Sequence, residues 1–153
     1  MSPQKPPPAN ATVLVSEALR PLFREGHHVR VQVPLVLGGS EPEPDVAVVA
    51  GDPRDFSDHP TAAILVVEVA ESSLAADRSE KGSLYARAGV PDYWIVNLVD
   101  RRLELYRDPI ELPSAPLGFA YRNATILLPG ESVRPLARPD AEVAVDALLP
   151  RLG

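Results

Sequence analysis

The sequence contains no cysteine, which excludes disulfides, zinc–thiolate sites and cysteine nucleophiles. Its three histidines, His27, His28 and His59, lack the spacing of a zinc motif. No apolar run approaches the roughly 20 residues of a membrane-spanning helix, so we expect a cytoplasmic protein with no membrane partner. Basic residues are few, with 15 Lys and Arg against 21 Asp and Glu and a net charge of -6. This acidity argues against a simple nucleic-acid-binding domain, which is usually basic.

The length of 153 residues is typical of one domain with its own core. The first ten residues, MSPQKPPPAN, are rich in proline and lack the apolar core of a signal peptide. We therefore expect a disordered lead over residues 1–10 and a single domain over residues 11–153.

Apolar periodicity predicts two helices among many strands. Helical spacing runs from Thr12 to Glu25, where Pro21 should kink or split the helix, and a second helix is expected from Ala75 to Ala88. The predicted strands are residues 28–37, 45–50, 63–70, 93–98, 103–107, 119–128, 132–136 and 142–145. This order predicts an α/β or α+β fold, with a mixed central β-sheet flanked by helices and extra C-terminal strands.

Glu68 is a charged residue inside an apolar strand, AILVVEVA. Its own face carries Ile64, Val66 and Ala70, and the opposite face is apolar as well. A carboxylate buried there without a partner would cost several kcal/mol or bind a proton. A metal ion or a lysine would compensate for it. A buried pair with an arginine, for structure alone, is the other interpretation.

Lys81 occupies an equally unusual place on the second predicted helix. At about 100° per residue it lies on the stripe that should pack on the sheet; the other members of this stripe are Leu74, Asp77, Leu84, Tyr85 and Ala88. The residues that should face elsewhere are Ser79, Glu80, Ser83, Ala86 and Arg87. A solvent-exposed ion pair with Asp77 is the alternative, although such a pair prefers the other face.

Asp45 follows Pro44 at the mouth of the second predicted strand, where Pro-Asp is by itself an ordinary turn pair. If the strands of Asp45 and Glu68 are neighbours, the two carboxylates can converge on one cation. Mg²⁺ suits such a pair because it binds one or two carboxylates and keeps several waters. The metal would lower the pKa of a bound water and neutralise charge on a phosphate. Lys81 would orient the water or stabilise the transition state.

Four segments, EPEPDVAVV, LVVEVAESS, DRSEKGSLYARAGVPDYWIV and LELYR, resemble the Uma2 family of nucleases. This family belongs to the PD-(D/E)XK superfamily, with the restriction-endonuclease-like fold. The resemblance is strong over residues 35–107 and weak on the flanks. It implies that Asp45 and Glu68 bind the metal and that Lys81 is catalytic. The usual superfamily lysine stands two positions after the second acid, at Ala70 here; the Uma2 variant carries it on the following helix.

The resemblance also implies that Asp77 and Tyr85 support the lysine. Glu17, on the first helix, is a candidate for a further acid, with an exposed surface position as the alternative. The implied cofactor is Mg²⁺ or Mn²⁺, the implied partner is nucleic acid, with DNA favoured, and the implied assembly is a homodimer. The resulting prediction is an Mg²⁺-dependent endonuclease that hydrolyses phosphodiester bonds of DNA.

Two other functions remain open from the sequence. One is a catalytically inactive nuclease-fold module that binds or regulates, which the sequence pI of about 5.0 favours. The other is an acid-pair hydrolase of a different substrate, which would leave Lys81 without a role.

Three surface patterns carry weaker hypotheses. Tyr93 and Trp94 would offer a base-stacking platform if exposed, but strand alternation should bury at least one ring. A basic group could form a phosphate-facing edge or a solvated surface; it comprises Arg20, Arg24, His27, His28 and Arg30. An acidic group near Asp45 fits solvated loops better than a wider metal site; it comprises Glu41, Glu43, Asp52, Asp55 and Asp58.

Overall fold

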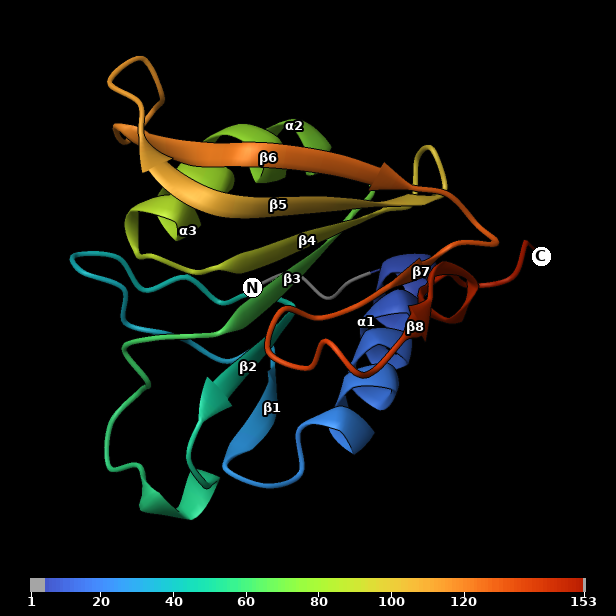
Figure 1. The fold of residues 1–153 in the computed structure, drawn as a ribbon, viewed down its shortest axis with the longest axis horizontal. Coiled ribbons are helices and arrows are strands. Elements are labelled where there is room, and N and C mark those ends of the chain that lie inside the picture. Colours follow the sequence, from blue (N-terminus) through green and yellow to red (C-terminus); the bar gives the residue numbers. More distant parts are fainter. Residues whose placement is uncertain (1–4, 153) are drawn as a thin grey trace.

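A six-stranded sheet in the order β1-β2-β3-β4-β5-β6 forms the centre of the computed structural model, which describes residues 5–152 (Figure 1). Strands β3 and β4 are parallel, and all other neighbours in this sheet are antiparallel. The strands are β1 (His27–Val31), β2 (Val46–Ala50), β3 (Leu65–Ala70), β4 (Asp92–Asn97), β5 (Arg102–Glu111) and β6 (Phe119–Leu127). The predicted mixed sheet with flanking helices is confirmed.

The helices cover both faces of this sheet (Figure 1). On one face α1 (Pro6–Leu19) packs through Val15 and Leu19 into a core that includes Val67 and Trp94. On the other face a continuous helical segment buries Tyr85 against Tyr93 and its neighbours. This segment consists of α2 (Leu74–Ala76), the π-helical turn η3 (Asp77–Lys81) and α3 (Gly82–Arg87). The alternation of β3 therefore directs Glu68 toward the second helical layer.

Helix α1 begins earlier than the sequence predicts. It starts at Pro6, so the disorder expected over residues 1–10 is not found over residues 6–10, while residues 1–4 lie outside the described part. Proline is compatible with a first helical turn because the N–H groups there have no intrahelical partner. At the other end α1 stops at Leu19 and a 3₁₀ turn, η1 (Arg20–Leu22), follows. The break expected at Pro21 is confirmed.

Strand β1 is shorter than predicted. It ends at Val31, because Gln32 adopts a left-handed φ of 50° and Pro34 cannot donate a ladder hydrogen bond. The rest of the predicted strand turns over the sheet, where Leu35 and Leu37 are buried in the same layer as Tyr85. The prediction of a strand over residues 32–37 is therefore wrong.

The second helix differs from the prediction by its π-helical turn. The additional residue in η3 rotates the packed face, so that Ser83 and Ala86, expected to face elsewhere, are buried. Ala88, expected on the packed stripe, is exposed. The positions of Asp77 and Tyr85 on the packed face agree with the prediction.

The C-terminal region contains less strand than predicted. Strand β7 covers only Ser132–Val133 and β8 only Val143–Ala144, and the two form a separate sheet. Short 3₁₀ turns complete the fold at η2 (Pro53–Asp55) and η4 (Val145–Leu148). Over residues 5–152, none of the helices combines the length and the apolar character of a membrane span.

Candidate active site

Asp45 and Glu68 meet where β2 begins and β3 ends. Val46 pairs with Val67 in the antiparallel ladder, so the residue before β2 comes opposite Glu68. The Asp45 backbone N–H donates to Glu68 Oε1 at 3.0 Å, and Asp45 Oδ2 accepts from the Val69 backbone N–H at 2.7 Å. The two acids therefore lie on neighbouring strands, as the metal hypothesis requires.

Glu68 is 2% exposed, and its second oxygen is surrounded by donors. Oε2 accepts from the Tyr85 hydroxyl at 2.8 Å and lies 3.2 Å from Lys81 Nζ. Burial raises the pKa of Glu68 to about 7, although the charge of Lys81 lowers it. The partner of this buried acid is a lysine, so a structural pair with arginine is excluded for Glu68.

Lys81 bridges two buried carboxylates. Its ammonium lies 3.3 Å from Asp77 Oδ1 as well as 3.2 Å from Glu68 Oε2, while its side chain remains 44% exposed. Burial acts to lower the pKa of Lys81, but the charges of Glu68 and Asp77 outweigh it and leave that pKa raised. Lys81 is therefore a cation that faces both the buried acids and the solvent.

Asp77 and Tyr85, expected to support the lysine, both join this cluster. Asp77 is 1% exposed, its Oδ2 accepts from Ser73 Oγ at 2.8 Å, and burial raises its pKa. Burial and, to a smaller extent, the charge of Glu68 raise the pKa of Tyr85. Its hydroxyl therefore keeps its proton and remains a hydrogen-bond donor. The alternative i, i+4 ion pair of Asp77 with Lys81 does form, and Lys81 is partly exposed; Asp77, however, is buried, and the same ammonium also lies beside Glu68.

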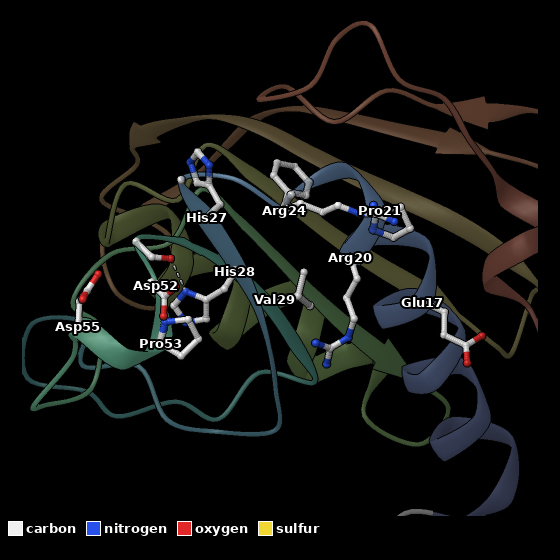
Figure 2. Close-up of a pocket in the computed structure, with 13 residues that line it drawn as sticks. Glu17, Arg20, Pro21, Arg24, His27, His28, Val29, Asp52, Pro53 and Asp55 are labelled. Atoms are coloured by element: carbon white, nitrogen blue, oxygen red, sulfur yellow. Dashed lines mark hydrogen bonds between the residues drawn. The ribbon is translucent and has the colours of Figure 1, made fainter.

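Glu17 lies elsewhere. It is exposed on α1, which covers the opposite face of the sheet from the layer that receives Glu68. There it lines a cavity of about 760 Å³, and Figure 2 shows its carboxylate on the far side of that cavity from Asp52 and Asp55. The structure does not bring Glu17 into contact with the cluster around Lys81.

The basic group expected on one edge is partly gathered in the same cavity (Figure 2), to which it contributes Arg20, Arg24, His27 and His28. Two acids of the β2–β3 connection line it too, and Asp52 is bound by Arg54 through both of its oxygens. The lining thus mixes charges of both signs, at the end of β2 away from Asp45. The hypothesis of a base-stacking platform is wrong, because the side chains of Tyr93 and Trp94 are both fully buried.

The residues present fit a divalent metal held by two acids. Within residues 5–152 no group of three or more His, Cys, Asp or Glu side chains is arranged as a metal site. Mg²⁺ needs only one or two carboxylates and completes its shell with water. Asp45 and Glu68 supply these, and a bound cation would offset the burial that raises the pKa of Glu68 to about 7. Asp77 Oδ1 is buried as well, and the cation beside it is the Lys81 ammonium at 3.3 Å, which it shares with Glu68.

Sequence reasoning missed a second buried glutamate. Glu104 is 1% exposed and accepts hydrogen bonds from Arg78, Asn97 and Tyr106. Its alternation with Leu103 and Leu105 in LELYR is typical of a half-exposed strand, in which a glutamate faces water. One signal in the sequence could have indicated it: Arg78 is a second basic residue close to Lys81 and needs an acidic partner of its own.

Comparison with known proteins identifies the fold. Residues 1–146 match the family model described as "Uma2: Putative restriction endonuclease". Among solved structures, the chain is similar to "a putative nuclease belonging to DUF820" from Anabaena variabilis, at 12% sequence identity and a TM-score of 0.70. The alignment covers 97% of this chain and 82% of that one, and at this identity it shows the fold alone. No curated protein matches.

Proposed function

Since the chain belongs to the Uma2 family, described as putative restriction endonucleases, we propose that it is an Mg²⁺-dependent endonuclease hydrolysing phosphodiester bonds of DNA. One observation carries this proposal: the Lys81 ammonium lies 3.2 Å from Glu68, which hydrogen-bonds to Asp45 on the neighbouring strand. Two acids that meet beside a partly exposed cation suit the hydrolysis of a charged phosphodiester.

Asp45 and Glu68 would hold the metal, Mg²⁺ or Mn²⁺. When bound, the metal would lower the pKa of a water molecule and neutralise charge on the phosphate. The Val69 N–H fixes the Asp45 carboxylate, and the Tyr85 hydroxyl fixes that of Glu68. These hydrogen bonds hold both carboxylates in one orientation before substrate arrives.

Lys81 would act on the substrate directly. Its three N–H donors and full positive charge can orient the attacking water or stabilise the negative charge that grows on the phosphoryl oxygens. Asp77 would keep the ammonium in place when the metal shares Glu68. This gives Asp77 a supporting role, and its 3.3 Å contact with the ammonium is the basis for it.

Cleavage and metal binding test the proposal together. Plasmid DNA, single-stranded DNA and RNA are incubated with Mn²⁺ and with wild type, Lys81→Ala, Glu68→Gln or Lys5→Ala. We expect Lys81→Ala to lose cleavage by at least about a hundredfold and to retain Mn²⁺ binding in calorimetry. Glu68→Gln should lose both. Lys5, the only other lysine, is the control and should leave cleavage unchanged. Absence of cleavage of every nucleic acid by wild type would contradict the proposal.

A binding or regulatory module without catalysis is the second candidate. It is favoured by the completeness of the Glu68 environment, where Asp45, Tyr85 and Lys81 already occupy both oxygens. A net charge of -6 also suits a protein partner better than a free nucleic acid. Calorimetry separates the two candidates, since the module requires no Mn²⁺ binding.

The proposed assembly is a homodimer, which would present two such sites to the two strands of a duplex. Family resemblance is its basis. Sedimentation equilibrium should give twice the 16.5 kDa of the chain, and a mass of one chain at micromolar concentration would contradict it.

A further inference from the structure

Two buried glutamates lie in one row across the sheet. Glu68 on β3 pairs in register with Ile95 on β4, and Ile95 pairs with Glu104 on β5. Their side chains are therefore on the same face, two strand spacings or about 10 Å apart. Both are at most 2% exposed. Each buried charge thus needs its own cation from the helical layer above.

Arg78 is the cation that binds Glu104. Its Nε donates to Oε1 at 3.0 Å and its Nη2 to Oε2 at 2.5 Å, which is the bidentate geometry of the strongest charged hydrogen bonds. The Tyr106 hydroxyl and Asn97 Nδ2 add donors at 2.7 and 2.9 Å. Burial acts to raise the pKa of Glu104, but Arg78 and these donors hold it lowered. Glu104 is therefore a fixed anionic anchor.

Both cations come from the same π-helical turn. Arg78 and Lys81 belong to η3, yet they bind glutamates on β5 and β3. Residues three apart on a helix lie only about 5–6 Å from each other, so the two side chains must diverge to span the row. Between them the Tyr93 hydroxyl of β4 donates to the Asp77 carbonyl at 2.8 Å. The turn is thus tied to three adjacent strands.

We propose that the Arg78–Glu104 pair is a clamp that positions the proposed catalytic lysine. With Arg78 fixed on β5, the turn can neither rotate nor slide, so the Lys81 ammonium is held between Glu68 and Asp77. Arg78 and Glu104 are positioning residues, because they act on the reaction through Lys81. The catalytic part of this inference rests on the proposed function, whereas the holding of Lys81 does not.

A purely structural role is the competing explanation, and the chain contains a matched control for it. Asp92 on β4 is also 1% exposed and is bound by Arg107 through Nε at 2.9 Å and Nη2 at 3.3 Å. This pair joins β4 to β5 without touching η3. Disrupting it should cost comparable stability and leave Lys81 in place.

Lysine labelling tests the clamp without requiring activity. The chain has two lysines, Lys81 and Lys5, so acetylation measured by mass spectrometry gives a site and an internal reference in one sample. The variants are Arg78→Lys, Arg78→Met with Glu104→Gln, and the control Arg107→Met with Asp92→Asn. Each double variant removes both charges, which avoids leaving a buried carboxylate alone. Cleavage of DNA with Mn²⁺ is measured on the same samples.

We expect Lys81 labelling, relative to Lys5, to rise about tenfold in the Arg78/Glu104 double variant, the factor equivalent to one charged hydrogen bond. Arg78→Lys should give an intermediate rise, and the control should change the ratio less than about twofold. Where wild type cleaves DNA, kcat should fall with little change in KM. An unchanged ratio in the folded double variant, or an equal rise in the control, would overturn the clamp. A wild type that does not cleave, with the expected labelling, would overturn the proposed function alone.

Discussion

The protonation state of Glu68 is the residue-level property on which the site depends. Burial raises its pKa to about 7, and the neighbouring Asp45 and Asp77 act in the same direction against Lys81. Near neutral pH the carboxyl therefore exchanges between a neutral and a charged form. Burial favours the neutral form, whereas Lys81 and a bound divalent cation favour the charged form. Metal binding and proton release are consequently linked at this residue.

Stability should fall as pH rises through the range in which Glu68 ionises. The pKa of Glu68 is about 7 in the folded protein against 4.5 for an ordinary glutamate, so between these values the folded state binds more protons than the unfolded state. The shift corresponds to roughly 3 kcal/mol, present below about pH 4.5 and lost by pH 7. Glu68→Gln should therefore raise the free energy of unfolding at pH 8 and leave it nearly unchanged at pH 4.5. Urea unfolding in EDTA across this range measures both.

Glu104→Gln is a control that should change the free energy of unfolding in the opposite direction. The pKa of Glu104 is lowered in the folded state, so its ionised form stabilises the protein above the ordinary pKa and this contribution disappears in acid. The substitution should destabilise the protein at pH 8, by about 1–3 kcal/mol for a hydrogen-bonded charge. If both glutamine variants shifted stability in the same direction at pH 8, the assignment of Glu68 as a destabilising buried acid would be wrong.

At the scale of helices and strands, the sequence predicts those features that depend on the local pattern of apolar residues and prolines. The apolar residues around Glu68 predicted a central strand, and Pro21 predicted the break after α1; both are confirmed. The end of β1 was missed because Leu35 continues the apolar alternation although the chain has already turned. Glu104 was missed because its main partner, Arg78 of η3, is far from it in the sequence and is not visible in a five-residue alternation.

The π-helical turn is the element that periodicity could not predict. A regular α-helix places Lys81 correctly on the face that packs on the sheet. It places Ser83 and Ala86 on the opposite face, whereas both are buried. The additional residue is fixed by long-range contacts, with Arg78 bound to β5 and Asp77 bound by Tyr93. Such contacts leave no local signature. Glu68 and Lys81 could be chosen from the sequence because each is a charge in an apolar pattern, and Asp45 because it precedes a strand next to that of Glu68; the contacts of Arg78 and Tyr93 with this turn could not.

Deleting Ser79 should convert η3 to a regular α-helix. Ser79 is exposed, its hydroxyl donates to the Ala75 carbonyl, and its own carbonyl accepts from the Gly82 backbone N–H, so its removal takes away no buried side chain. Helix α3 can keep Tyr85 and Ala86 packed against the sheet. Arg78 and Lys81, however, can then no longer reach Glu104 and Glu68 at the same time. We expect a folded protein, by near-UV circular dichroism, whose cleavage activity is lost.

Ser79→Ala is the matched control, because it removes the hydroxyl and keeps the number of residues in the turn. It should retain activity within about twofold, as expected for an exposed substitution. If the deletion variant cleaved DNA as well as Ser79→Ala, the π-helical turn would have no role in placing Lys81.

At the scale of the whole molecule, net charge is the main obstacle to nucleic-acid binding. The net charge of the chain is -6, and three of its carboxylates lie in the proposed site with a single lysine. Phosphates approaching this point are repelled until a cation is bound. The basic side chains that line the cavity of Figure 2 do not offset this, because Glu17 lies on one side of that cavity and Asp52 and Asp55 lie on the other.

Binding of DNA should therefore require a divalent cation. We expect fluorescence anisotropy of a labelled duplex to show binding in Ca²⁺, which uses the same oxygen ligands as Mg²⁺, and none in EDTA at equal ionic strength. Glu68→Gln should abolish the difference, whereas Lys5→Ala should keep it. Few phosphates are contacted by so acidic a chain, so affinity should fall less steeply between about 50 and 200 mM salt than for a basic domain. Tight binding in EDTA would show that the duplex docks away from Asp45 and Glu68.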